Sequence, residues 1–152
     1  MLGHGRRQLL HFGITAHPTV ERIARLITEA FPWAEIPEKL IRNNDAIYGA
    51  AFKNRLRSMG IRYGPTEFRS PWQNGCIERL IGSIRRECLD YIFIRDEGHL
   101  RRILKAYAKY YNEARTHLSL DKNAPDSRPV RRGEHIKRIP HLGGLHHEYV
   151  RI

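Results

Sequence analysis

Cysteine is scarce in this sequence of 152 residues, and long apolar runs are missing. The two cysteines, Cys76 and Cys88, fall on one expected helix, whose rise separates them by roughly 18 Å. A disulfide needs Cα atoms within about 7 Å, so a disulfide-stapled fold is excluded and we expect a cytoplasmic protein with reduced thiols. The sequence contains neither an uncharged apolar stretch of membrane-spanning length nor a signal-peptide core at its N-terminus.

Acidic residues are also few. Sixteen Asp and Glu stand against 27 Lys and Arg, which gives a net charge of +11, and the first acidic residue is Glu21. This excess of positive charge indicates a polyanionic partner: DNA, RNA or an acidic membrane surface. The nine histidines form no Cys/His pair with zinc-finger spacing. An apolar share of 41% is enough for a packed core.

Short strands alternate with helices along the chain, which predicts an α/β fold with a small sheet. We expect strands at residues 8–14, 39–42 and 61–63. We expect helices at residues 18–31, 51–59, from about 74 to 88, and 97–118. The third of these helices should bury Ile77, Ile81, Ile84 and Cys88 on one face. Residues 124–152 are rich in Pro, Gly, Arg and His, and we expect them to be an extended or disordered tail.

The segment from Ser70 to Glu87 is the most informative for chemistry. Asn74, Glu78, Gly82 and Arg85 share one line of the expected helix. The line offers a carboxylate near a helix N-terminus, a place where a backbone can approach closely, and a cation. These properties suit a divalent metal beside a phosphodiester. An ordinary amphipathic helix with solvated Glu and Arg side chains explains the same pattern.

Several blocks of the sequence carry a family resemblance. They read PWQNG…ERLIGSIRREC and HLRRILKAYAKYYNEARTHLSLDKNAP, with HFGITAHPT and IRNNDAIYG before them and LGGLHHEYVRI at the end. The chain resembles the Asp-Asp-Glu integrase-core transposases of bacterial insertion sequences, which are relatives of retroviral integrases. The resemblance implies a ribonuclease H-like fold that carries out DNA integration by strand transfer. It also implies three acidic residues that hold two divalent ions, Mg²⁺ or Mn²⁺.

The resemblance places the catalytic positions one by one. Glu78 maps onto the third acidic residue. The second maps onto Asn43, a neutral residue where the family has aspartate, and Asp45 is a possible substitute as a metal ligand with Glu78. No carboxylate stands at the first position. On this basis we expect an N-terminally truncated integrase core without its first strand over residues 1–121, followed by a basic C-terminal tail over residues 122–152.

DNA contacts are expected close to the glutamate, from the arginines that flank it and from two residues of the preceding loop. These candidates are Arg79, Arg85, Arg86, Trp72 and Asn74. Trp72 could stack on a base or cap the core. Further cations on the last helix and in the tail would bind phosphate without sequence preference. Arg128 is one of these tail cations.

Three interpretations stay open: an active strand-transfer enzyme, a catalytically impaired fragment that still binds DNA, and a dimerising module that modulates a full-length transposase. The partners are accordingly DNA, a second copy of the chain, or a full-length transposase.

Overall fold

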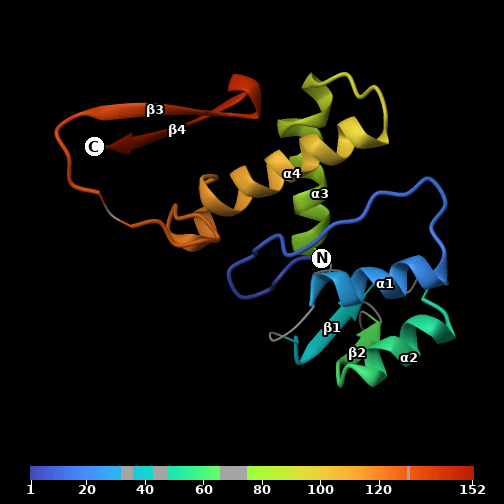
Figure 1. The fold of residues 1–152 in the computed structure, drawn as a ribbon. Helices are drawn as coiled ribbons and strands as arrows, with labels where there is room; N and C mark the ends of the chain where they lie inside the picture. Colours follow the sequence, from blue (N-terminus) through green and yellow to red (C-terminus); the bar gives the residue numbers. More distant parts are fainter. Residues whose placement is uncertain (32–35, 43–47, 66–74, 130) are drawn as a thin grey trace. The chain divides into compact units, whose positions relative to one another are not determined.

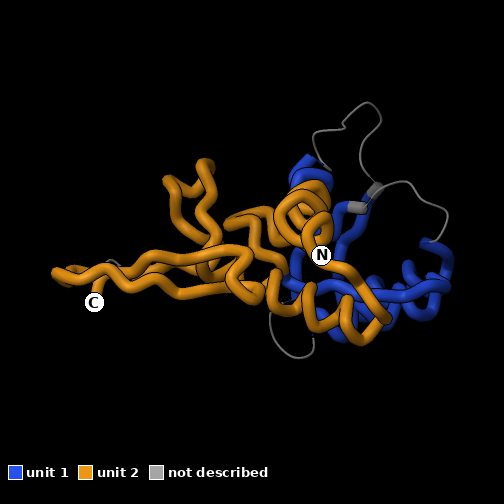
Figure 2. The backbone as a smooth tube through the Cα atoms, turned by 90° about the horizontal axis from the view of Figure 1, so that it is seen from above, with its two compact units in different colours: residues 1, 10–79 blue, residues 2–9, 80–152 orange. Residues whose placement is uncertain are grey.

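A computed structural model describes residues 1–31, 36–42, 48–65, 75–129 and 131–152. Four α-helices and four strands lie in this part of the chain (Figure 1), and this mixture confirms the α/β class. The chain divides into two compact units (Figure 2). Met1 and Leu10–Arg79 form unit 1, and Leu2–Leu9 and Leu80–Ile152 form unit 2.

Unit 1 contains helix α1 (Val20–Ala30), strand β1 (Lys39–Arg42), helix α2 (Ala50–Ser58) and strand β2 (Arg62–Pro65). The two strands pair in parallel, and α2 makes the crossover between them, as parallel neighbours require. These four elements agree with the sequence prediction to within a few residues. Thr19 caps α1: its hydroxyl accepts a hydrogen bond from the Arg22 amide at 3.2 Å.

The core of unit 1 lies between its helices and β2. Ile27 of α1 packs with Phe52 and Leu56 of α2 and with Ile61, and all four are at most 3% exposed. Gly60 ends α2 with φ of +70°, a left-handed conformation that glycine adopts without steric cost. The chain can therefore reverse directly from α2 into β2.

Helix α3 (Gly75–Glu87) crosses the division between the units, and the 3-10 helix η2 (Leu89–Tyr91) follows it. The prediction of its bounds was close, but the prediction of its buried face was only partly right. Cys88 is buried as expected, whereas Ile81 is 60% exposed and Leu80 and Ser83 are buried instead. The buried line runs through positions 80, 83 and 87, since Glu87 finds polar partners inside unit 2.

Helix α4 (Glu97–Glu113) is capped at its N-terminus by Asp96, whose side chain accepts a hydrogen bond from the His99 amide at 2.6 Å. Its end differs from the prediction, which extended the helix to Leu118. The chain leaves the helix at Ala114 and turns back, so that the His117 amide bonds the Asn123 carbonyl at 3.0 Å. Leu118 lies in the 3-10 helix η3 (Leu118–Leu120) and is 87% exposed, so it is not part of the buried stripe.

The strand predicted over residues 8–14 is absent; Leu9 forms only an isolated bridge with Leu2. The reason lies in the main-chain groups of Leu9. Its amide donates to the Asn112 side chain at 2.8 Å and its carbonyl accepts from the same side chain at 3.0 Å. Both groups that a β-ladder would need are therefore already bonded to a helix residue.

The C-terminal region holds a regular hairpin where we expected an extended or disordered tail. Strand β3 (Ile136–His141) pairs antiparallel with β4 (His146–Arg151), joined through the 3-10 helix η4 (Leu142–Gly144). Gly143 and Gly144 have φ of +68° and +94° and make the reversal, so the Gly-Gly pair is a turn signal rather than a sign of disorder. The proposed boundary between a core and a C-terminal segment at residue 121 stays a prediction.

Candidate nucleic-acid interface and its supporting polar centre

The predicted catalytic glutamate lies at the start of α3. Glu78 is in the first turn of the helix and its side chain is exposed, together with those of Arg79, Arg85 and Arg86. The structure thus brings four of the predicted site residues onto solvent-exposed positions of one helix. The other four predicted residues lie outside the described part of the chain: Asn43, Asp45, Trp72 and Asn74.

Gly82 allows a close approach, as expected, but the group that approaches it is the side chain of Arg86 from the same helix. A Cβ built on Gly82 would stand 2.9 Å from the Arg86 guanidinium, so this side chain lies directly over the glycine backbone. Any larger residue at this position would push the guanidinium aside. The glycine therefore lets Arg86 lie along the helix surface.

The cations of the chain fall into two groups, depending on whether a described carboxylate neutralises them. Arg85 lies 3.7 Å from Asp90, and on α4 Arg101 pairs with Glu97 and Lys109 with Glu113. A second group forms no ion pair within the ranges that the structure describes. On α3, on α4 and in residues 131–152 these exposed cations are Arg79, Arg86, Arg102, Lys105, Arg131, Arg132, Lys137, Arg138 and Arg151. The second group is the one available to an anionic partner.

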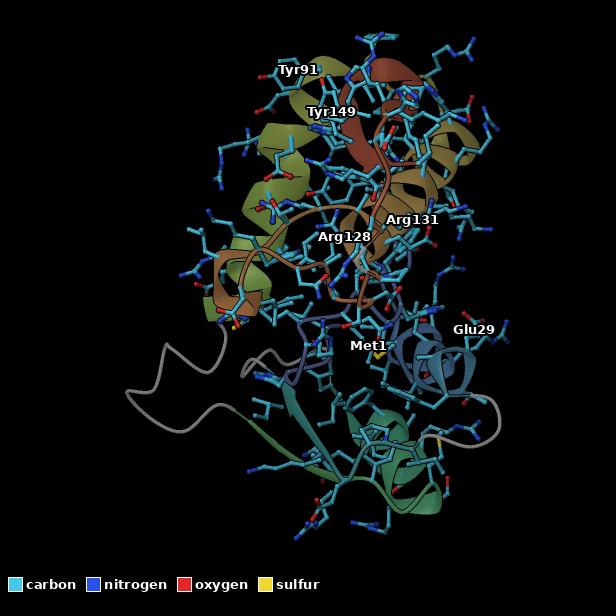
Figure 3. All side chains as sticks on the ribbon, turned by 90° about the vertical axis from the view of Figure 1, so that its left-hand side faces the viewer. Met1, Glu29, Tyr91, Arg128, Arg131 and Tyr149 are labelled. Carbon is cyan, nitrogen blue, oxygen red and sulfur yellow. The ribbon has the colours of Figure 1, made fainter. Side chains whose placement is uncertain are left out.

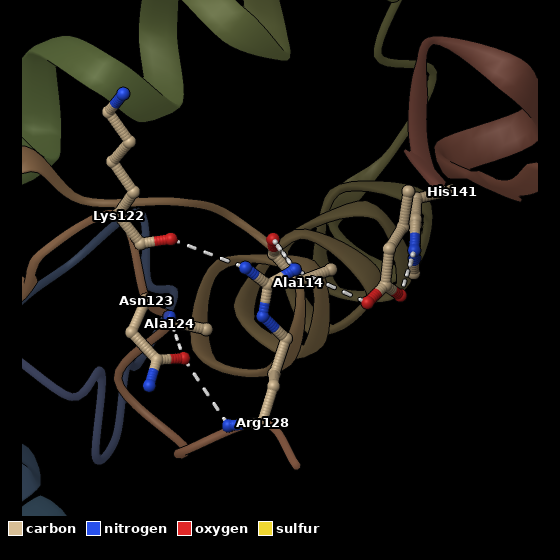
Figure 4. Close-up of polar contacts among 7 residues, drawn as sticks. Ala114, Lys122, Asn123, Ala124, Arg128 and His141 are labelled. Carbon is tan, nitrogen blue, oxygen red and sulfur yellow. Dashed lines mark hydrogen bonds and ion pairs between the residues drawn. The ribbon is translucent and has the colours of Figure 1, made fainter. Parts of the chain in front are cut away.

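Arg128 belongs to the paired group, although the sequence suggested that it contacts DNA. Its guanidinium donates to the carbonyls of Ala114 and Lys122 at 3.3 Å and lies 3.4 Å from a carboxylate oxygen of Glu148 (Figure 4). Its own amide donates to the Asn123 side chain at 3.3 Å. Arg128 therefore ties the end of α4 to β4.

Several partly buried polar side chains of unit 2 bond to one another around Glu87 and Arg115, and we call this group the polar centre. Arg115 binds the Glu87 carboxylate through two hydrogen bonds, of 2.6 and 2.8 Å, and the Tyr107 hydroxyl donates to the same carboxylate at 2.9 Å. Burial alone would raise the pKa of Glu87. The hydrogen bonds and charge of Arg115 and the bond from Tyr107 outweigh it, and the pKa lies below its usual value. Burial and the neighbouring carboxylate raise the pKa of Tyr107, so its hydroxyl stays a donor.

Two histidines complete this centre. His146 Nε2 lies 2.6 Å from the Glu87 carbonyl, which can only accept, so the ring carries its proton on that nitrogen. His117 is 7% exposed, and its Nδ1 lies 3.4 Å from the Arg115 guanidinium. Burial and the charge of Arg115 lower the pKa of His117, so the ring stays neutral. His146 thus connects β4 to the end of α3, and His117 packs against Tyr111 and Arg115 where the chain leaves α4.

Asn112, Arg115 and His117 all make structural contacts within unit 2. Sequence reasoning missed the roles of Glu87 and His146 in this centre. Glu87 could have been found from its spacing, since it lies one further turn along the line of Leu80 and Ser83. No comparable signal marks His146.

Residues 59–125 match the family model described as Integrase core domain. This match confirms the resemblance of the chain to integrase-core transposases and indicates DNA integration or transposition as the general function. The matched range contains Glu78 and its arginines on α3, as well as Glu87, Tyr107, Arg115 and His117 of the polar centre, whereas His146 lies outside it. It does not reach Asn43 or Asp45.

Divalent metal ions are the usual cofactors of integrase-core proteins. Within the ranges that the structure describes, no three His, Cys, Asp or Glu residues come together in a group that could hold a metal. Glu78 is the one predicted carboxylate ligand among the described residues, so this part of the chain does not by itself fit a two-ion site. Of the helices in the described ranges, none has the length and apolar character needed to cross a membrane.

Proposed function

We propose that this chain acts on DNA as a ribonuclease H-like integrase-core protein of the strand-transfer type, and that on its own it binds DNA but is impaired in catalysis. One observation carries the proposal. The integrase-core match covers the helix on which Glu78 stands exposed beside Arg79 and Arg86, two cations without an ion pair among the described carboxylates. A carboxylate flanked by free cations suits a phosphodiester backbone that is held close to a metal ligand.

Impaired catalysis follows from the residue types at the acidic positions. Asn43 offers a neutral carbonyl oxygen where the family pattern has a charged carboxylate, and hard divalent cations prefer carboxylates. Glu78 and Asp45 are then the carboxylates left to hold Mg²⁺ or Mn²⁺. A bound ion would supply Lewis-acid activation of a phosphodiester. We expect its affinity for this chain to be low.

The first experiment measures DNA binding by the full chain with labelled duplex DNA at low and at moderate salt. The excess of free cations predicts retardation that needs no metal and that falls steeply as salt is added. Lack of binding at low ionic strength would contradict the proposed function.

The second experiment measures DNA cleavage and end joining with Mg²⁺ or Mn²⁺, for the wild type, Asn43→Asp, Glu78→Gln and the control Glu113→Gln. Glu113 is an exposed acid on α4 that pairs with Lys109, within the same family match. We expect little product from the wild type and more from Asn43→Asp. Glu78→Gln should abolish this gain in the Asn43→Asp background, and Glu113→Gln should leave it unchanged. Strong wild-type activity would show instead that the chain is a competent enzyme.

A further inference from the structure

The C-terminal hairpin has two faces that differ in their contacts. Successive side chains of a strand point to opposite sides, and the register pairs Arg138 with Tyr149 and Ile139 with Glu148. Glu148 and Ile139 thus share one face, the inner face, with His141 and His146. The outer face consists of Ile136, Arg138, Pro140, His147, Tyr149 and Arg151.

The inner face is occupied by unit 2 itself. The His146 ring stacks on Tyr110 of α4 with centroids 4.6 Å apart and planes 3° apart, and its Nε2 contacts the Glu87 carbonyl. His141 also lies against Tyr110, at 5.3 Å, and 3.6 Å from Glu148. These contacts fix which side of the ribbon faces away from the rest of the unit.

The outer face is exposed and positively charged. Ile136 and Tyr149 are each 66% exposed, and Arg138 and Arg151 are exposed as well. Tyr149 is labelled on the hairpin in Figure 3. Arg151 donates to the Gly133 carbonyl at 3.3 Å, and neither arginine pairs with a carboxylate in the described ranges. Glu148 is the one acidic residue of the two strands, and it belongs to the inner face.

We propose that this outer face binds double-stranded DNA as a two-stranded ribbon, a surface separate from the α3 residues. The inference rests on the proposed function and extends it. The major groove admits a two-stranded β-ribbon, and six residues at about 3.4 Å each give the hairpin a length of roughly 20 Å. Duplex DNA presents a charge about every 1.7 Å of its axis, so Arg138 and Arg151 can each reach a phosphate. Tyr149 lies directly opposite Arg138 and adds an amphipathic contact beside it.

Charge complementarity favours DNA over a protein partner. The six side chains of the outer face include two arginines and no carboxylate, and protein–DNA interfaces carry much more positive charge than protein–protein interfaces. The exposed cations Arg131 and Arg132 come shortly before β3 in the sequence, together with one exposed carboxylate, Glu134. The outer face itself presents two arginines and no carboxylate to a polyanion.

The test uses the full chain and one labelled DNA sequence in duplex and single-stranded form. The variants are Arg138→Ala with Arg151→Ala, and Tyr149→Ala. The control for charge is Lys109→Ala, since Lys109 is an exposed cation on α4 that already pairs with Glu113. The control for an aromatic residue is Tyr91→Ala, which is 70% exposed in η2. Thermal unfolding by circular dichroism checks that each variant stays folded.

We expect the double arginine variant to lower the slope of log K against log salt by about 2, at roughly 0.9 for each phosphate. Its duplex affinity at low salt should fall about tenfold, and that of Tyr149→Ala about fivefold. The Lys109→Ala and Tyr91→Ala controls should stay within about twofold of the wild type.

Three results would overturn the inference while leaving the proposed function standing. In the first, the outer-face variants bind duplex DNA as tightly as the controls do. In the second, the wild type binds the single strand more tightly than the duplex, and in the third the outer-face variants mainly change the oligomeric state. If the wild type fails to bind duplex at all, the proposed function is contradicted as well.

Discussion

Arg115 binds Glu87 across 28 residues of chain, through two parallel N–H···O hydrogen bonds from one guanidinium to one carboxylate. The two side chains are 23% and 27% exposed, so the pair is largely shielded from solvent and joins the end of α3 to the segment after α4. Such two-pronged contacts fix geometry as well as contributing energy. The pair fixes how these two segments of unit 2 meet.

Removing one partner of this pair should destabilise unit 2. Arg115→Met leaves the Glu87 carboxylate partly buried with only the Tyr107 hydroxyl as a side-chain partner, and we expect a loss of about 2 kcal/mol in the free energy of unfolding. The measurement is urea unfolding followed by circular dichroism. Arg101→Met is the matched control, because its pair with Glu97 is an exposed contact within one helix, and it should cost less than about 0.5 kcal/mol. If both variants lose the same free energy of unfolding, the shielded pair stabilises the protein no more than the exposed pair does.

The lowered pKa of Glu87 predicts an acid-dependent loss of stability. Because its folded-state pKa lies below the ordinary value of 4.5, its contribution is fully present above that value and is lost as the pH falls through the folded pKa. The free energy of unfolding should therefore drop more steeply below pH 4.5 for the wild type than for Glu87→Gln. Unfolding curves of both proteins at pH 7 and at steps between pH 5 and 3 test this. Parallel pH profiles would contradict the shift.

Asn112 should hold the N-terminal segment to unit 2. Asn112→Ala removes both side-chain bonds to the Leu9 main chain, and we expect it to cost about 1–3 kcal/mol and to release residues 2–9. Limited trypsin digestion should then cleave faster at Arg6 and Arg7, read by mass spectrometry. Asn54→Ala, an exposed position on α2, is the control and should leave the cleavage rate unchanged. Unchanged cleavage in Asn112→Ala would mean that other contacts of the segment suffice.

The distinction between free and paired cations predicts different salt effects on DNA binding. Arg79→Ala with Arg86→Ala should lower the slope of log K against log salt by about 2, if each side chain contacts one phosphate. Arg101→Ala with Lys109→Ala removes the same charge, but from residues already paired with Glu97 and Glu113, and should lower the slope by less than half as much. Fluorescence anisotropy at several salt concentrations measures both. Identical slopes would mean that net charge alone governs binding.

The sequence pattern predicted the secondary structure well where interactions between residues close in sequence determine it. The Val20–Ala30 helix, the Lys39–Arg42 strand and the Gly60 stop all follow from helical periodicity, β-branched content and the conformational freedom of glycine. The sequence also predicted the bounds of α3 and the start of α4 to within a residue or two. Unit 1 was therefore predicted better than unit 2.

Tertiary contacts explain the errors. Ile81 was expected inside, but the helix is rotated so that Glu87 can reach Arg115, a residue whose distance in sequence hides the pairing. The predicted strand around Leu9 failed for a similar reason, because Asn112 satisfies its main chain. For the candidate site, the resemblance identified Glu78 and the arginines near it, and the structure shows that these side chains are exposed. Their roles in catalysis and DNA binding stay predictions. The hairpin faces depend on the cross-strand register, which composition does not reveal.

The bonds between residues 2–9 and a distant part of unit 2 have a consequence for the order of folding. Arg6 donates to the carbonyls of Ala124 and Pro125, at 2.9 and 2.6 Å, and Gln8 bonds Asp126 at 2.6 Å, so these residues bind partners 118 or 119 positions further along the chain. Unit 1 lies between these partners in the sequence and can form earlier from its own contacts. Contacts between residues so far apart in sequence form slowly, because a long loop must close first. A partly folded chain would therefore carry a folded unit 1 while residues 2–9 are still unattached.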